Sequence, residues 1–189
     1  MAKLIYSTNT SLDGFIEDAS GVFEWTAPDE EVLAYITDAL RPVGTYLFGR
    51  RLYETMAVWD TMRTEDSSGQ RDFQTIWRAA DKVVYSATVP DVSGPRTRLE
   101  RTFDADAVRA MKDTAARDLL VGGADLAAEA IHAGLVDELL LFVYPLVVGG
   151  GKPGLPERAR LPERAWLRLE LLAERRFASG TVHLRYAIR

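Results

Sequence analysis

One segment of this chain limits the fold more than any other, because it places a strand, two glycines, a helix and a second strand in direct succession. The apolar residues 119–121 end at Gly122 and Gly123, residues 124–132 are helix formers, and residues 135–148 return to strand composition. A strand that leads through a helix into another strand is the unit from which parallel sheets are built. The segment therefore predicts an α/β fold.

The two glycines of this segment also suggest a ligand. Glycine lets the backbone approach a bound group closely, and the N–H groups of a first helical turn carry partial positive charge. A phosphate-bearing ligand such as a dinucleotide fits this end of the helix. The alternative is a tight turn in which the glycines only supply a backbone conformation with positive φ, and the segment alone favours neither.

The rest of the chain continues the alternation of strand and helix patterns. Strands are expected at residues 3–7, 45–48, 82–86 and, at an edge, 97–103. Helices are expected after a Thr26 cap, from Arg50, at residues 72–80, and at residues 107–117 after Asp104 or Asp106. Residues 61–70 are predicted to be a surface loop, and the prolines at residues 153–162 predict irregular structure.

The C-terminal end is predicted to be a hairpin of residues 167–177 and 181–188. Its last strand alternates, so that one face is expected to be buried through Val182, Leu184, Tyr186 and Ile188. The predicted architecture is a mostly parallel, twisted central sheet flanked by helices, in a single domain over residues 1–189, with an antiparallel hairpin at its C-terminal edge.

Composition excludes several classes of protein. The 189 residues include no cysteine and give a net charge of −5. Without cysteine there are no disulfides, thiolate nucleophiles or cysteine metal ligands, which fits a cytoplasmic protein. The acidic balance argues against nucleic-acid binding, and no apolar run approaches the ~20 residues of a membrane span. His132 and His183 fall in different predicted elements and are expected at surface or helix-end positions, so no metal site is predicted.

Polar residues follow three of the predicted strands. Ligands of parallel sheets bind beyond the carboxyl ends of the strands, and the segments expected to converge there are 49–51, 86–88 and 122–123. Arg50 and Arg51 would suit a 2′-phosphate, which arginine binds bidentately, and a solvated helix start is the alternative. Ser86 and Thr88 supply hydroxyl groups, which are also ordinary in loops.

Three further residues are candidates for the substrate side of such a site. Asp13 follows the first strand, where a carboxylate could relay a proton or anchor a polar substrate, and an Asp–Gly turn is the alternative. Glu31 is a second candidate, with a role at the start of a helix as its alternative. Trp25 either covers a site or belongs to the core.

Five motifs in this order resemble a known family. They are Ser11–Leu12–Asp13–Gly14–Phe15–Ile16, Gly49–Arg50–Arg51 with Tyr53–Glu54, Leu119–Leu120–Val121–Gly122–Gly123, Gly134–Leu135–Val136–Asp137–Glu138–Leu139 and Phe177–Ala178–Ser179–Gly180. The chain resembles the dihydrofolate-reductase-like family that includes the reductase domain of the riboflavin-biosynthesis deaminase–reductase. The resemblance implies a dihydrofolate-reductase-like fold, NADPH as cofactor, a homodimer, and a small heterocyclic substrate.

The resemblance also implies roles for individual residues. Cofactor-binding positions would be Gly49, Arg50, Arg51, Ser86, Thr88, Gly122, Gly123, Ala124 and Leu126. Asp13 would lie near the substrate and the nicotinamide, whereas Trp25 and Glu31 are substrate-side candidates from their places in the sequence alone. The implied activity is that of a 5-amino-6-(5-phosphoribosylamino)uracil reductase, in which a ribosyl group is reduced to ribityl. A dihydrofolate or pterin reductase and a non-catalytic dimeric nucleotide-binding module are the alternatives.

The chain departs from the family pattern at three positions and in one segment, Gly154–Leu155–Pro156, which interrupts the leucine–phenylalanine that is usual after the late glycines. Ala124 stands where a third glycine is common, Leu52 where a threonine is common, and Asp125 places a carboxylate in the first helical turn. A carboxylate that faced inward there would repel a pyrophosphate. Asp125 must therefore point away from the helix end if a dinucleotide binds. The deaminase activity is excluded, because that chemistry uses zinc held by cysteines.

Overall fold

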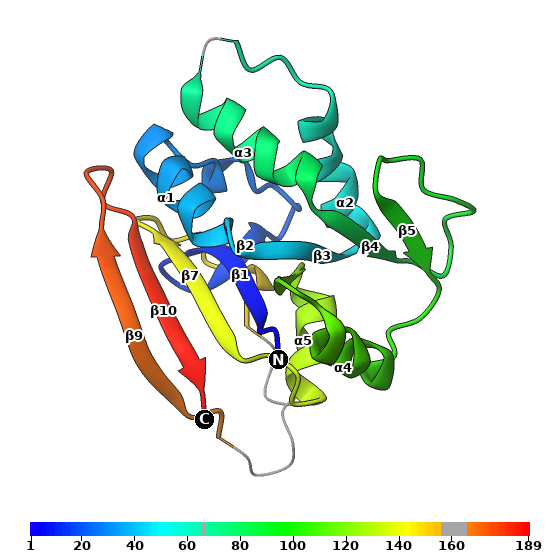
Figure 1. The fold of residues 1–189 in the computed structure, drawn as a ribbon. Helices are drawn as coiled ribbons and strands as arrows, with labels where there is room; N and C mark the ends of the chain where they lie inside the picture. The colour runs from blue at the N-terminus through cyan, green and yellow to red at the C-terminus, as the bar shows by residue number, and fades with distance from the viewer. Residues whose placement is uncertain (66, 156–165) are drawn as a thin grey trace.

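The computed structural model describes residues 1–65, 67–155 and 166–189 (Figure 1). Its strands are β1 (Leu4–Ser11), β2 (Phe15–Asp18), β3 (Val43–Gly49), β4 (Asp81–Tyr85), β5 (Thr97–Glu100), β6 (Asp118–Gly122), β7 (Glu138–Tyr144), β8 (Gly151–Pro153), β9 (Leu169–Arg176) and β10 (Val182–Ile188). Its helices are α1 (Glu30–Leu40), α2 (Arg50–Met56), α3 (Ser68–Ala79), α4 (Ala105–Thr114) and α5 (Ala124–His132), with short 3-10 helices η1 (Glu24–Thr26) and η2 (Ala57–Asp60).

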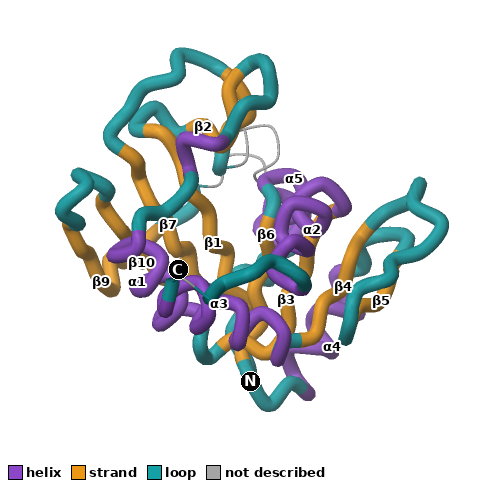
Figure 2. The backbone as a smooth tube through the Cα atoms, turned by 90° about the horizontal axis from the view of Figure 1, so that it is seen from above, coloured by secondary structure: helices purple, strands orange, loops and turns teal. Residues whose placement is uncertain are grey.

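The large sheet has the strand order β5-β4-β3-β6-β1-β7-β10-β9 in the described residues. All pairs from β5 to β7 are parallel, whereas β10 pairs antiparallel with β7 and with β9. This confirms the predicted α/β fold with a mostly parallel sheet and a C-terminal antiparallel hairpin. The strands β2 and β8 form a separate antiparallel ribbon, and Figure 2 shows β2 outside the large sheet.

Helices cover both faces of the sheet, so each face has its own apolar core (Figure 1). Helices α1, α2 and α3 close one face, where Trp77 of α3 stacks on Phe48 of β3. Helices α4 and α5 close the other face through Val108, Ala127 and Ile131. The buried parts of the central strands are largely apolar, as in other parallel sheets, although the second half of β1 is polar. The sheet is therefore a rigid frame whose strand ends hold fixed positions.

Two of the expected helix starts lie elsewhere. Thr26 does not cap α1, because it lies in η1 and its amide closes that short turn on the carbonyl of Phe23. The cap is Asp29, whose carboxylate accepts a hydrogen bond from the amide of Val32 at 2.8 Å. The loop predicted at residues 61–70 is shorter than expected, because the side chain of Ser67 caps a helix that begins at Ser68. Asp104 caps α4 as predicted.

The C-terminal strand also differs from the prediction. Its buried side chain is His183, which is 1% exposed, so the expectation of a surface histidine is wrong. The alternating apolar residues are only half-buried, because α1 covers the face of β10 that carries the imidazole. The prediction of irregular structure at residues 153–162 is partly tested: Pro153 ends β8, and residues 156–162 lie outside the described residues.

Candidate functional site

The three strand ends predicted to converge are neighbours in the sheet. Strand β3 lies between β4 and β6, with Gly49 beside Tyr85 and Phe48 beside Gly122. Because these strands are parallel, the arginine pair after β3, Ser86 after β4 and the glycine turn after β6 lie at one edge of the sheet. This is the edge where ligands of parallel sheets bind.

The glycine turn after β6 has a definite backbone geometry. Gly123 has φ +86° and stands at the N-cap position of α5, where it offers no side chain to the first turn. A Cβ atom on Gly122 would lie 2.5 Å from the ring of Phe48. Packing against Phe48 is therefore enough to require glycine at position 122, with or without a ligand. Ala124 and Leu126 are buried and anchor the helix. As in every α-helix, the N–H groups of its first turn have no intrahelical acceptors.

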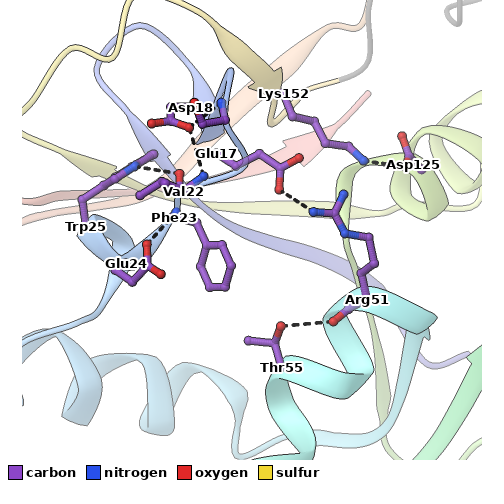
Figure 3. Close-up of polar contacts among 11 residues, drawn as sticks. Glu17, Asp18, Val22, Phe23, Glu24, Trp25, Arg51, Thr55, Asp125 and Lys152 are labelled. Carbon is purple, nitrogen blue, oxygen red and sulfur yellow. Dashed lines mark hydrogen bonds and ion pairs between the residues drawn. The ribbon is translucent and has the colours of Figure 1, made fainter.

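The arginine pair begins α2, but the two guanidinium groups have different partners. Arg50 lies 3.3 Å from Glu54 on the same helix, with Gly49 as the N-cap residue. Arg51 lies 3.3 Å from Glu17, which belongs to β2 (Figure 3). Both arginines are exposed at the edge where a phosphate was predicted, and only Arg51 is linked to the ribbon of β2 and β8.

Asp125 is neutralised by a residue that the sequence did not single out. Its Oδ2 atom accepts a hydrogen bond of 2.5 Å from Nζ of Lys152 on β8 (Figure 3). Glu17 was missed as well. No sequence signal joins these residues, because the Glu17–Arg51 and Asp125–Lys152 pairs are separated by 34 and 27 positions. They meet only because the ribbon reaches the first turns of both helices.

The ribbon itself is tied to the large sheet. The hydroxyl of the buried Tyr6 on β1 donates to the carbonyl of Gly154 at 2.5 Å, and the amide of Gly154 donates to the carbonyl of Gly14 at 2.8 Å. Burial raises the pKa of Tyr6 to about 12, so the hydroxyl keeps the proton that it donates. These two hydrogen bonds hold the ribbon in place beside the carboxyl ends of the strands.

Asp13 holds two loops together. Its carboxylate accepts hydrogen bonds from the hydroxyl of Ser11 at 2.6 Å and from the amides of Gly149 at 2.8 Å and Val148 at 3.2 Å. The Ser11 hydroxyl first, and then the two amides, hold the pKa of the Asp13 carboxyl below its usual value. The carboxylate is consequently ionised at neutral pH and carries no proton to donate.

Trp25 and Glu31 have structural contacts of their own. The ring of Trp25 meets Tyr144 edge-on at 6.5 Å, and its indole N–H donates to the carbonyl of Val22 at 3.3 Å. Both oxygens of Glu31 are engaged at the C-terminal hairpin, one by Arg175 at 3.0 Å and the other by the amide of Ala178 at 3.1 Å. Trp25 is packed against the core beside β7, and Glu31 ties α1 to the hairpin.

Ser86 shapes the loop after β4. Its hydroxyl oxygen accepts hydrogen bonds from the amides of Thr88 at 3.3 Å and Val89 at 3.2 Å, while Thr88 is exposed.

Among the described residues no group of three or more histidine, aspartate or glutamate side chains is placed to hold a metal ion. None of the described helices combines the length and the apolar character that a membrane crossing requires.

The chain is similar to known proteins over nearly its whole length. The family model described as RibD C-terminal domain matches residues 2–183. The Uncharacterized protein YyaP of Bacillus subtilis (strain 168) is 28% identical over 185 residues, which cover 97% of this chain and 94% of that protein.

Solved structures with the same fold include two informative neighbours. A putative riboflavin biosynthesis protein from Shewanella sp. PV-4 has a TM-score of 0.76 at 20% identity, covering 100% of this chain and 99% of that one. Dihydrofolate reductase from Enterococcus faecalis, in a complex with NADP(H), has a TM-score of 0.62 at 15% identity, covering 99% of this chain and 96% of that one. The likeness confirms the expected dihydrofolate-reductase-like fold.

Proposed function

The chain belongs to the RibD C-terminal domain family, and from this premise we propose that it is an NADPH-dependent reductase of a small heterocyclic substrate. The observation that carries the proposal is the adjacency of β4, β3 and β6, which brings Arg50–Arg51, Ser86 and the Gly122–Gly123 turn to one edge of the sheet. Guanidinium groups, a hydroxyl and the first turn of a helix are together what a dinucleotide with an additional phosphate requires.

The positions of these groups suggest which part of the dinucleotide each of them would bind. Arg50 and Arg51 would hold the 2′-phosphate, the first turn of α5 with Ala124 and Leu126 would lie along the pyrophosphate, and Ser86 with Thr88 would lie at the adenosine end. When bound, the cofactor supplies the hydride. The chain orients the reacting carbon of the substrate against the nicotinamide and keeps bulk water away from the hydride.

The substrate class proposed first is the ribosylamino-pyrimidine of riboflavin biosynthesis, and a pterin is the nearest alternative. Asp13 would lie beside the substrate and hold the loop of Val148 and Gly149, as it does in the structure. Because its carboxylate is ionised, the proton that accompanies hydride transfer would come from water. No deaminase step is proposed, because the chain has no cysteine to hold the zinc that this chemistry uses.

One observation favours a second function, that of a nucleotide-binding module without catalysis. The acidic candidates Asp13 and Glu31, and the Asp125 carboxylate of the first turn of α5, all have partners in the structure. All three carboxylates are therefore already engaged by groups of this chain. A protein of this kind would bind the dinucleotide at the same edge of the sheet and leave the substrate unreduced.

Thermal unfolding with and without cofactor tests the proposal. NADPH at a hundred times its Kd should stabilise the protein by about 2.7 kcal/mol, and absorbance at 340 nm should then fall when a ribosylamino-pyrimidine or dihydropterin substrate is added. A cofactor shift without oxidation of any substrate would support the non-catalytic module. If neither NADPH nor NADH raised Tm, the dinucleotide site itself would be refuted.

A further inference from the structure

Four charges of alternating sign join the ribbon to the two helices at the site. Arg51 pairs with Glu17, and Lys152 pairs with Asp125. Glu17 and Lys152 are also cross-strand partners in the register of β2 and β8. The order along the cluster is therefore positive, negative, positive, negative, and Figure 3 shows both ion pairs reaching from the ribbon to the first turns of α2 and α5. We call these four residues the charge cluster.

The two sides of the charge cluster differ in exposure. On the ribbon, the side chains of Glu17 and Lys152 are 17% and 28% exposed, whereas on the helices those of Arg51 and Asp125 are 66% and 73% exposed. The ribbon is fixed to β1 through Tyr6 and Gly154. The helix side chains are therefore the members that are free to turn toward another partner, and turning either of them leaves a charge of the ribbon without its counter-ion.

On the basis of the proposed function, we propose that Glu17 and Asp125 compete with the phosphates of the dinucleotide for Arg51 and Lys152. A carboxylate and a phosphate present the same kind of anionic oxygen to a guanidinium or ammonium group. The 2′-phosphate carries more charge than one carboxylate, and the two phosphates of the pyrophosphate together carry two charges against the one of Asp125. Cofactor binding then exchanges one anion for another at each cation. In this exchange Lys152 is a phosphate-binding residue of the site, and Glu17 is a specificity-determining residue.

The two pairs should act on different phosphates. Arg51 stands after β3, where the 2′-phosphate is proposed to lie, so Glu17 would oppose only a cofactor that has this phosphate. Asp125 and Lys152 stand at the first turn of α5, beside the proposed pyrophosphate, so Asp125 would oppose both NADPH and NADH. The charge cluster thus lowers the affinity for the dinucleotide at both positions. Each carboxylate is displaced from its cation only by a ligand that supplies the matching phosphate.

Equilibrium binding of NADPH and NADH to four forms of the full chain tests this inference. The forms are the wild type, Glu17→Gln, Asp125→Asn and the control Asp106→Asn. Asp106 matches Asp125, because it is an exposed aspartate in the first turn of α4 and pairs with Arg109. At low ionic strength Glu17→Gln should tighten NADPH about two- to fivefold and leave NADH unchanged, which is the size of effect expected for one ion pair at the protein surface whose cation is exposed. Asp125→Asn should tighten both cofactors by a similar factor.

Removal of the cations should have the opposite effect. Arg51→Gln should weaken NADPH alone, and Lys152→Gln should weaken NADPH and NADH together, while Asp106→Asn changes neither. If the wild type bound NADPH but Glu17→Gln and Asp125→Asn behaved as Asp106→Asn does, the competition would be refuted while the proposed function stood. Equal tightening of both cofactors by Glu17→Gln would overturn the assignment of Arg51 to the 2′-phosphate. A wild type that bound neither cofactor would refute the proposed function first.

Discussion

The imidazole of His183 packs between the rings of Tyr35 on α1 and Phe142 on β7, with ring centroids 4.8 and 4.7 Å away. Neither of its ring nitrogens has a hydrogen-bond partner among the described residues. Burial, and then the charge of Arg185, lowers the pKa of His183 to about 4. The histidine is therefore neutral in the native protein throughout the physiological range.

This residue should make stability depend on pH. In the unfolded chain a histidine titrates near 6.5, so between pH 6.5 and about 4 the unfolded state binds a proton that the native state does not. As the pH is lowered through this window, the free energy of unfolding should decrease. His183 contributes at most about 1.4 kcal/mol of this decrease per pH unit. Urea unfolding at pH 7, 6, 5 and 4.5 measures the loss. His183→Leu should show a smaller loss, and equal losses in both proteins would contradict the assignment.

At the scale of elements, the order of strands and helices could be predicted because each depends on local patterns. The β6–α5–β7 succession follows from an apolar run, a glycine pair and helix formers. Parallel pairing places the three strand ends at one edge of the sheet, whereas the order in which β4, β3 and β6 lie side by side comes from the structure. The ribbon of β2 and β8 could not be predicted, since its three- and four-residue strands carry no periodic pattern. For the same reason Glu17 and Lys152 could not be predicted as site residues, because their partners depend on the register of the ribbon.

The anchoring of the ribbon to β1 should show in the stability of the fold. Tyr6→Phe removes the hydroxyl that donates a hydrogen bond to the carbonyl of Gly154. The buried carbonyl is left without its partner, which should lower the free energy of unfolding by about 1–3 kcal/mol. Tyr144→Phe is the matched control, because the buried Tyr144 hydroxyl has no hydrogen-bond partner among the described residues. Urea unfolding should show a lower midpoint for Tyr6→Phe and no loss for Tyr144→Phe. A Tyr6→Phe midpoint equal to that of the wild type would mean that the ribbon does not depend on this bond.

At the scale of the whole molecule, the two edge strands of the large sheet both carry charges, but they differ in length and in the apolar side chains that they expose. The edge strand β5 is short and carries an ion pair between Arg98 and Glu100. Charges of this kind protect a sheet edge from pairing with another chain. The opposite edge, β9, is longer and exposes Leu169, Leu171 and Leu172. An exposed apolar edge strand is a template for pairing with a second chain.

We therefore expect the homodimer implied by the family resemblance to form through β9. Its sequence is acidic at Glu170 and Glu174 and basic at Arg175 and Arg176, so an antiparallel pair of β9 strands related by a two-fold axis would bring unlike charges toward each other. Light scattering after gel filtration should give twice the 21.0 kDa of one chain. The double variant Leu171→Lys, Leu172→Lys should be monomeric, because it buries charges at the pairing surface. Val58→Lys, which alters an exposed apolar residue of η2 away from this edge, should remain dimeric. A dimer that survived the double variant would place the interface elsewhere.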